Sequence, residues 1–182
     1  MAANGEISVN GTVKMTDPID GATFRRVLGH YPTGVCVVTA IEPDGTKAAL
    51  VVGSFTSVSL DPPLVAFFPD RNSSSWPRIE RAGKFCVNVL GSHQRDLCRR
   101  FSARSDDKFA GLNYGLSTNG SPVLEDVIAW IDCTLEAVHE AGDHYIVVGR
   151  VHELDIVRAD QPLVFFRGEY GNFAPLENEP RG

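Results

Sequence analysis

Short apolar runs, separated by turn-forming residues, are the main pattern along the middle of this chain. Runs of this length that are rich in Val, Ile and Phe are typical of β-strands. The pattern predicts strands at 35–40, 48–54, 64–68, 85–90 and 163–170. Pro43, Asp44 and Gly45 separate the first two strands, which indicates a tight hairpin turn between them.

Two longer stretches, 128–139 and 144–157, alternate apolar and polar residues around the turn sequence EAGD. This alternation predicts a long antiparallel hairpin. Short helices are predicted at 20–30, 75–83 and 92–102, the last with Ser92 as its N-cap. Strands outnumber helices, so the pattern predicts a mainly β protein, a closed barrel with a few helices outside it.

The domain boundaries follow from where this pattern starts and stops. Residues 1–20 are polar and Gly-rich, without an apolar period, and are predicted to form a flexible N-terminal arm. Residues 21–174 form the predicted barrel domain, and 175–182 a C-terminal tail. A chain of 182 residues is long enough for one domain with a sizeable core.

Composition narrows the classes of function. With 43% hydrophobic residues and a net charge of −6, the chain reads as a soluble globular protein with no nucleic-acid or membrane partner. We find no membrane-length apolar run and no signal-peptide core. The four cysteines form no Cys-x-x-Cys pair, which favours reduced thiols and a cytoplasmic location: Cys36, Cys86, Cys98 and Cys133.

Familiar catalytic motifs are missing from the sequence. It has no Gly-x-Gly-x-x-Gly after a strand, no P-loop, no Gly-x-Ser-x-Gly and no His-Glu-x-x-His. His144 and His152 are an even number of residues apart and share a strand face, but two partly exposed strand histidines explain them more simply than a metal pair. No metal site is predicted.

Hydroxyl groups gather at two places instead. In "SFTSVSLDPPLVAFF" (54–68), Ser54, Thr56, Ser57 and Ser59 precede an apolar strand, and Asn72 to Ser75 precede a helix whose free N–H groups attract an anion. Such groups suit a phosphate and a polyol chain. Each serine taken alone is explained equally well by a turn or a helix cap. Two clusters in one small barrel favour a phosphorylated ligand.

Five segments, in this order, resemble the flavin reductase family, the small reductase components of two-component flavin monooxygenases. They are "FRRVLGHYPTGVCVVTA", "GSFTSVSLDPPLVAFF", "FCVNVL" followed by "RRFSARSDDKFAG", "GDHYIVVGRV" and "PLVFFRGEYG". The resemblance runs from about Phe24 to Phe173. It implies an FMN-binding split barrel, a six-stranded antiparallel Greek-key-type barrel with short flanking helices, which is usually a homodimer.

The resemblance also implies an activity. The implied activity is that of an NADH-dependent flavin reductase, with NADPH as the alternative hydride donor. The enzyme passes a hydride to FAD or FMN, and the reduced flavin diffuses to a partner monooxygenase. Because this chemistry belongs to the cofactor, the protein need only bind and orient its ligands, which accounts for the missing acid–base pair. Alternatives are another split-barrel flavin enzyme, of the pyridoxamine-phosphate-oxidase or deazaflavin-reductase type, a non-catalytic flavin-binding protein, and a β-barrel interaction protein.

The residues implied by the resemblance lie at strand ends and in loops. His144 meets the nicotinamide, with a surface histidine near a turn as its alternative. The flavin-binding set is Thr33, Gly34, Val35, Val52, Gly53, Ser54, Phe55, Ser57, Ser59, Ser73, Ser74, Ser75, Asn88, Val89, Leu90 and Tyr170. Tyr170 lies near the nicotinamide entrance or is a packed aromatic at the barrel end. Four basic residues could meet phosphates or form surface ion pairs: Arg99, Arg100, Lys108 and Arg167.

Overall fold

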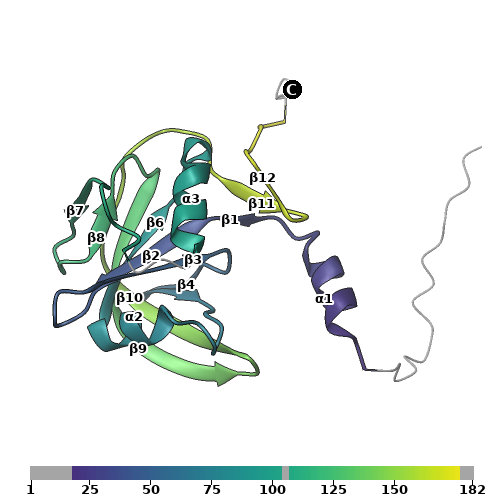
Figure 1. Ribbon diagram of the computed structural model, residues 1–182, viewed down its shortest axis with the longest axis horizontal. Coiled ribbons are helices and arrows are strands. Elements are labelled where there is room, and N and C mark those ends of the chain that lie inside the picture. Colours follow the sequence, from purple (N-terminus) through teal and green to yellow (C-terminus); the bar gives the residue numbers. More distant parts are fainter. Residues whose placement is uncertain (1–17, 104–106, 177–182) are drawn as a thin grey trace, which may run out of the picture.

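The protein is described from a computed structural model covering residues 18–103 and 107–176. Its main sheet contains seven antiparallel strands, in the order β3 (Lys47–Val52), β2 (Cys36–Ile41), β6 (Lys84–Val89), β9 (Ala129–Ala141), β10 (His144–Ile156), β5 (Pro63–Phe67) and β4 (Thr56–Leu60). Figure 1 shows this sheet curving into a partly open barrel. The two edge strands, β3 and β4, are not hydrogen-bonded to each other, so the barrel is open between them. The predicted mainly β split barrel is confirmed.

The main sheet has seven strands rather than the six expected, because residues 56–60 form a strand. Their hydroxyl-rich sequence lacks the apolar alternation that identifies a half-buried strand. β4 pairs with β5 along one side and exposes most of its side chains. An edge strand in water needs only its backbone hydrogen bonds and tolerates polar residues on both faces.

The predicted strand at 163–170 is divided in two. Arg167 and Gly168 have positive φ angles of 51° and 85° and form a turn between β11 (Val164–Phe166) and β12 (Glu169–Gly171). These two strands join β1 (Thr33–Gly34) in a separate three-stranded sheet. That sheet lies between the barrel and the first helix (Figure 1).

Short helices complete the fold: α1 (Gly21–Leu28), α2 (Trp76–Ala82), the 3₁₀ helix η1 (Ser92–Gln94) and α3 (Arg95–Ser102), with a small hairpin of β7 (Tyr114–Leu116) and β8 (Pro122–Leu124). The helix predicted at 92–102 therefore begins with a 3₁₀ turn, and Gln94 rather than Ser92 accepts a hydrogen bond from a preceding backbone N–H, that of Gly91, at 3.0 Å. Within the described ranges, no helix is long and apolar enough to cross a membrane.

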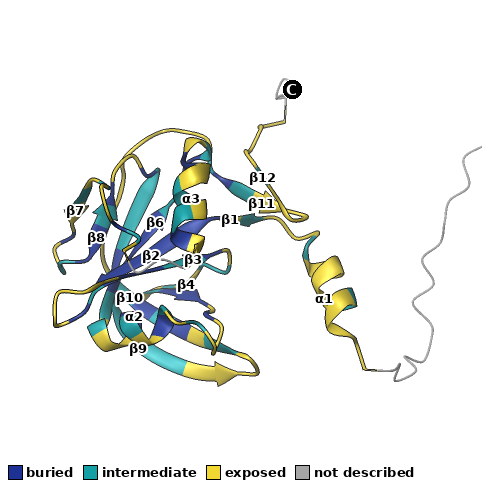
Figure 2. Ribbon diagram, viewed as in Figure 1, coloured by how far each residue is buried: buried dark blue, intermediate teal, exposed yellow. Residues whose placement is uncertain are grey.

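Two core clusters fix α2 and α3 on opposite sides of β2, which is buried on both faces. Inside the barrel, Trp76 of α2 packs edge-on against Phe67, and Phe67 against Phe85, with ring centroids 5.9 and 5.4 Å apart. On the other face, Phe101 of α3 packs in the same way against Phe109, at 5.2 Å. Figure 2 shows β2 in dark blue, the colour of buried residues, whereas α1 is largely exposed.

The predicted long hairpin is confirmed as β9 and β10, whose tip lies at Gly142. The chain that leaves β5 docks on this tip, because Tyr145 donates a backbone hydrogen bond to the carbonyl of Pro69 and Arg71 donates one to Asp143, both at 2.9 Å. From there the serine-rich segment continues to α2. One loop therefore connects the hairpin tip with the start of α2.

Candidate functional site

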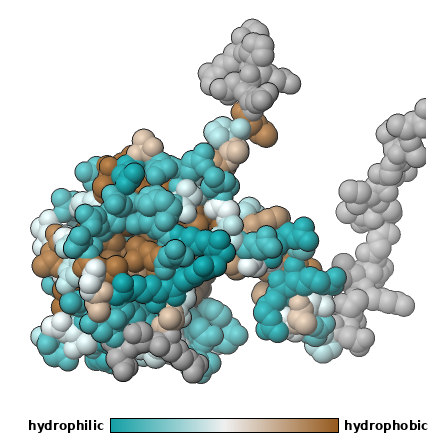
Figure 3. Space-filling model, turned by 45° about the horizontal axis from the view of Figure 1, so that its top comes forward, coloured by the Kyte–Doolittle hydropathy of each residue, from teal (hydrophilic) through white to brown (hydrophobic). Residues whose placement is uncertain are grey.

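Two cavities adjoin the chain segment that leaves β3 at the opening of the barrel. The larger, about 990 Å³, is called the polar cavity here and is lined by Leu50, Val51, Asn72, Ser73, Ser74, Ser75, Arg78, Phe101, Ser102, Ala103 and Lys108. The smaller, about 380 Å³, is called the apolar pocket and is lined by Ser54, Phe68, Ala141, His144, Tyr145 and Ile146. Leu50 and Ser54 belong to the same short segment, so one stretch of backbone borders both spaces. Figure 3 shows a hydrophobic recess bordered by hydrophilic residues on the face of the barrel.

The predicted serine cluster before α2 lies at the polar cavity, but not all of its groups are free. The Ser73 hydroxyl accepts hydrogen bonds from the backbone N–H groups of Ser75 and Trp76, at 3.3 and 3.2 Å. The anion-attracting N–H groups expected at this point are thus already capped, and α2 has only seven residues. The side chains of Ser74 and Ser75 make no hydrogen bond with another described residue and still line the cavity.

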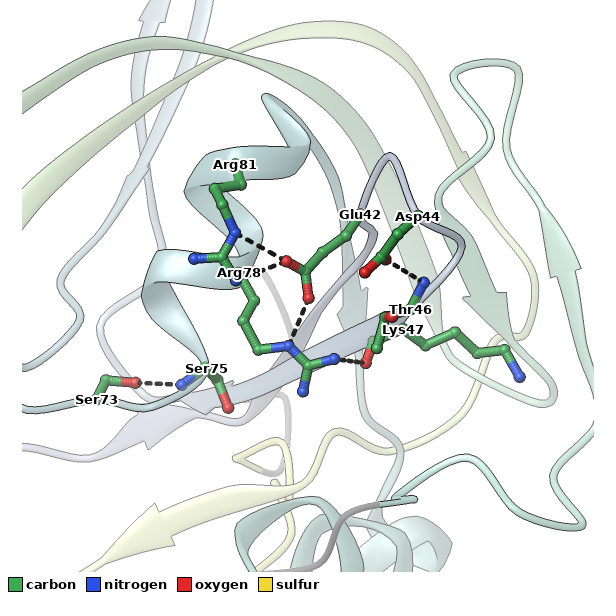
Figure 4. Close-up of polar contacts among 8 residues, drawn as sticks. All are labelled: Glu42, Asp44, Thr46, Lys47, Ser73, Ser75, Arg78 and Arg81. Carbon is green, nitrogen blue, oxygen red and sulfur yellow. Dashed lines mark hydrogen bonds and ion pairs between the residues drawn. The ribbon is translucent and has the colours of Figure 1, made fainter.

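A charged residue that the sequence did not single out, Arg78, also lines this cavity. Its Nε donates to Oε1 of Glu42 at 2.6 Å, and its Nη2 donates to the Lys47 carbonyl at 3.0 Å. Glu42 is only 8% exposed and also accepts from Nε and Nη2 of Arg81, at 2.9 and 2.6 Å (Figure 4). The hydrogen bond from Arg78 lowers the pKa of the Glu42 carboxyl. One carboxylate therefore holds two arginines.

Lys108, one of the four basic residues considered from the sequence, faces the same cavity. Its Nζ donates to the carbonyl of Phe101 at 2.8 Å. Burial, and after it the charge on Arg78, lower the pKa of the Lys108 ammonium. Two cations thus converge on a space that also presents serine hydroxyls, a donor set that fits a phosphate.

The apolar pocket contains the predicted nicotinamide residue, His144, and the predicted flavin residue, Ser54. His144 begins β10, and its Nδ1 lies 2.7 Å from Oδ1 of Asp143. This hydrogen bond and the charge of the imidazole lower the pKa of Asp143. Ser54 Oγ accepts from the Phe68 N–H at 2.9 Å and so ties the segment after β3 to the end of β5. The sequence placed these two side chains far apart, and the fold brings them to one pocket.

Thr33 and Gly53 are also brought together, beside the opening of the barrel. A Cβ built on Gly53 would lie 2.8 Å from Thr33 Oγ1, closer than real Cβ contacts allow. The absence of a side chain at this position lets two backbone segments approach each other. Next to them, Gly34 is exposed, Val52 is buried, and Phe55 packs against the barrel core.

Ser57 and Ser59 do not share a face of β4, although residues two apart in a regular strand would. Ser57 pairs with Val65 and Ser59 with Leu64, so a bulge lies between the two serines. Because neighbouring residues of β5 point to opposite faces, the paired serines do so too. Ser57 is on the face of Val65, which belongs to the barrel core. The two hydroxyls therefore lie on opposite faces of β4.

Three other predicted flavin residues are held in the core rather than at a cavity. The Asn88 side chain is fully buried, donates to the Val37 carbonyl at 3.2 Å, and accepts from the Leu124 N–H at 2.8 Å. Val35 and Leu90 are buried, and the Leu90 N–H donates to the Val35 carbonyl at 3.0 Å. Val89, their neighbour, is partly buried against the barrel core. Strand pairing and core hydrogen bonds use groups of these residues that a ligand would need.

Tyr170 lies at a different cavity from His144. Together with Arg95 it lines a space of about 300 Å³ next to β12. Its hydroxyl lies 3.3 Å from Sγ of Cys98, and the guanidinium of Arg95 lies 5.9 Å from the centre of its ring. The sequence allowed two positions for Tyr170, near the nicotinamide entrance or packed at the barrel end. These contacts are those of a packed aromatic.

Comparison with known proteins identifies the family. The model of the flavin reductase-like domain matches residues 28–174. The chain belongs to this flavin reductase family. It is 63% identical to a flavin reductase from Pseudomonas putida, over 87% of this chain and 93% of that one. It is 45% identical to HsaB, the reductase subunit of a flavin-dependent monooxygenase from Rhodococcus jostii, over 96% and 89% of the two chains.

A solved structure of a flavin reductase relative agrees in fold. The NADH:FAD oxidoreductase SgcE6 of Streptomyces globisporus, in complex with NAD and FAD fragments, superposes with a TM-score of 0.82 at 32% identity. The match covers 91% of this chain and 99% of that one. The flavin reductase resemblance inferred from five sequence segments is confirmed.

Proposed function

We propose that this protein transfers a hydride from NADH to FAD or FMN and releases the reduced flavin to a separate monooxygenase. The observation that carries the proposal is the 63% identity to a flavin reductase along most of both chains. The hydride donor is taken from the NADH:FAD oxidoreductase relative, and the partner from the reductase subunit of a monooxygenase.

The residues at the barrel opening fit a flavin. Its phosphate would lie in the polar cavity, where Ser74 and Ser75 offer hydroxyls and Arg78 and Lys108 offer positive charge. The ring would lie along the segment that joins the two cavities, next to Gly53 and the Thr33 side chain that lies against it. Ser57, exposed on the face of β4 that it shares with Val65, is the hydroxyl of that strand proposed to contact it.

His144 is the residue proposed to position the nicotinamide. It lies in the apolar pocket, at the other end of the same segment from the polar cavity. The bound flavin supplies the hydride chemistry, and the protein holds the two ring systems in contact while Phe68 and Ile146 limit the access of water. Asp143 fixes the imidazole from the side of its Nδ1.

A steady-state assay tests this function. NADH and NADPH are each supplied with FAD, FMN and riboflavin, and oxidation of the nicotinamide is followed by its absorbance in air, where oxygen reoxidises the reduced flavin. We expect rapid NADH oxidation that depends on added flavin. A colourless protein that oxidises no NADH with any of the three flavins would contradict the proposal.

We further propose that the protein is a homodimer. Phe24, Val27 and Leu28 share one face of α1 and remain 57%, 57% and 50% exposed. Figure 1 shows α1 standing apart from the barrel, so within the described chain this face has little to cover it. A second copy would bury it. Light scattering at micromolar concentration tests this, and a monomeric mass would contradict it.

A further inference from the structure

Arg78 stands where two spaces meet. Besides the polar cavity, it lines a smaller one of about 240 Å³ next to the turn between β2 and β3. Ser75 and Lys108 line both as well. A ligand group bound between these three residues therefore has room on either side, as the phosphate of FMN or the diphosphate of FAD would need.

The orientation of Arg78 is fixed by contacts that leave part of it available. Nε is used by Glu42 and Nη2 by the carbonyl of Lys47. Nη1 has no hydrogen-bond partner among residues 18–103 and 107–176. The side chain is 31% exposed, and the third nitrogen of its guanidinium remains free of the two contacts drawn in Figure 4. The arginine is anchored on one side and open on the other.

Arg81 provides a natural contrast within the same cluster. It binds the same carboxylate from the next turn of α2, with Nη2 at 2.6 Å from Glu42 Oε2. It is 59% exposed and does not line either space. Two other carboxylates lie beside this cluster: Asp44, whose pKa is lowered by its hydrogen bonds with Thr46 and also by the charges of Arg78 and Arg81, and Asp107, which lines the smaller space. No described carboxylate lines the polar cavity itself, where Arg78 and Lys108 present positive charge beside the serine hydroxyls.

We propose that Arg78, held in place by Glu42 and acting with Lys108, binds the flavin phosphate and makes the protein prefer FMN and FAD to riboflavin. Arg78 is the specificity-determining residue, and Glu42 is a positioning residue that acts through it. The proposal rests on the proposed function, since it names the part of the flavin that the polar cavity recognises. A guanidinium suits this role because it can use one edge for the anchor and another for the phosphate.

The test compares affinities for riboflavin, FMN and FAD, measured by calorimetry on the full chain. Replacing Arg78 with Met should weaken FMN and FAD by about 10- to 100-fold and leave riboflavin unchanged, because a charged hydrogen bond is lost. Arg78→Lys should fall between, since it keeps the charge without the anchored fork. Arg81→Met is the matched control and should leave all three affinities unchanged.

Glu42→Gln tests the positioning role. Removal of its negative charge would by itself strengthen phosphate binding, whereas loss of the anchor would weaken it. We expect FMN to bind about 3- to 10-fold more weakly with riboflavin unaffected, because a neutral amide holds a guanidinium about half as strongly as a carboxylate. Tighter FMN binding by this variant would overturn the positioning role.

The outcomes separate this proposal from the function on which it rests. If the unaltered protein binds no flavin, the proposed function fails and this inference fails with it. If it binds flavins but Arg78→Met leaves the ratio of riboflavin to FMN affinity unchanged, the inference alone is overturned. A raised KM for NADH in Arg78→Met, with an unchanged flavin ratio, would also overturn it, because the phosphate would then belong to the nicotinamide nucleotide.

Discussion

The polar cavity and the apolar pocket border the same short segment, yet they are built in different ways. In the polar cavity, Arg78 reaches Glu42, which is 36 residues away in the sequence, and Lys108 comes from beyond α3. In the apolar pocket, His144 is held by its neighbour Asp143 at the tip of a hairpin. One site depends on distant parts of the chain, and the other depends mainly on a turn.

This difference follows from the charge that each site carries. Converging cations repel each other, so the polar cavity needs a buried carboxylate and a rigid sheet beneath it. The apolar pocket carries little charge and can be made from exposed strand ends. Changes to the scaffold should therefore disturb the polar cavity first, and changes at the hairpin tip should remain local. The following predictions test this contrast.

The largest effect is expected from the buried amide of Asn88, which ties β6 to β2 and β8. Asn88→Val leaves the Leu124 N–H and the Val37 carbonyl without this partner in the core. We expect the free energy of unfolding to fall by about 2–4 kcal/mol, measured by urea denaturation. Asn72→Ala, at an exposed residue of the polar cavity, should change it by less than about 0.5 kcal/mol.

Flavin affinity measured on Asn88→Val separates two roles for Asn88. If Asn88→Val were as stable as the unaltered protein but bound flavin weakly, Asn88 would contact the ligand, as the family resemblance implied. If Asn88→Val loses flavin affinity and is also less stable than the unaltered protein, Asn88 supports the scaffold and does not contact the ligand.

The second effect concerns the apolar pocket. His144→Ala should raise the KM for NADH about tenfold, or lower the reduction rate to a similar extent, because positioning of the hydride donor is lost. Flavin affinity and stability should not change, since the polar cavity is built independently. His152→Ala is the matched control, because His152 lies on the same strand, bonds Thr134 Oγ1 at 2.7 Å and does not line the pocket. Normal NADH kinetics in His144→Ala would return His144 to the role of a surface histidine.

Much of the fold could be predicted from the sequence because its strands carry their own pattern. The apolar run of β2 and the alternation of β9 and β10 are local signals, and both were identified correctly. β4 was missed because an edge strand needs no apolar face. The turn within 163–170 was missed because it depends on a positive φ at Arg167, a residue type that rarely adopts one.

The candidate site was predictable to a smaller extent, for related reasons. Ser54 and His144 were identified by resemblance and do share a pocket. The sequence could not indicate that a bulge separates Ser57 from Ser59, because a bulge is a property of the strand pairing. Nor could it indicate Arg78, since a long-range ion pair leaves no spacing to detect.

The third prediction uses the bulge of β4 to sharpen the contrast. Ser57→Ala should weaken flavin binding by about 0.5–1.5 kcal/mol, the value of one ligand hydrogen bond, because Ser57 is exposed on the face of β4 that it shares with Val65. Ser59→Ala should leave the affinity unchanged, since Ser59 lies on the other face. Titration of FMN fluorescence measures both. Equal losses in the two variants would mean that the bulge does not separate the hydroxyls in the bound protein.

The smallest effect is a change in how stability depends on pH. The hydrogen bond from Arg78 lowers the pKa of Glu42 below its ordinary value of 4.5. A carboxyl whose pKa is lower in the folded state stabilises the fold fully above the unfolded value and loses this contribution as the pH falls towards the folded value. The stability of the unaltered protein should therefore fall faster than that of Glu42→Gln as the pH is lowered from about 6 to about 4.

This last comparison removes the contributions of carboxyls that lie away from the arginine cluster; Asp44, whose pKa is lowered by its hydrogen bonds with Thr46 and also by the charges of Arg78 and Arg81, is the exception. Glu136 and Asp143 also have lowered pKa values, and their contributions cancel in the difference between the two stability curves. The effect is small because only part of the Glu42 titration is complete at the acid end of the range. Urea denaturation at several pH values measures it. If the free energies of unfolding of the two proteins changed in parallel with pH, the carboxylate would hold Arg78 no more firmly than a neutral amide does. The contrast between an anchored polar cavity and a locally built pocket would then have no electrostatic basis.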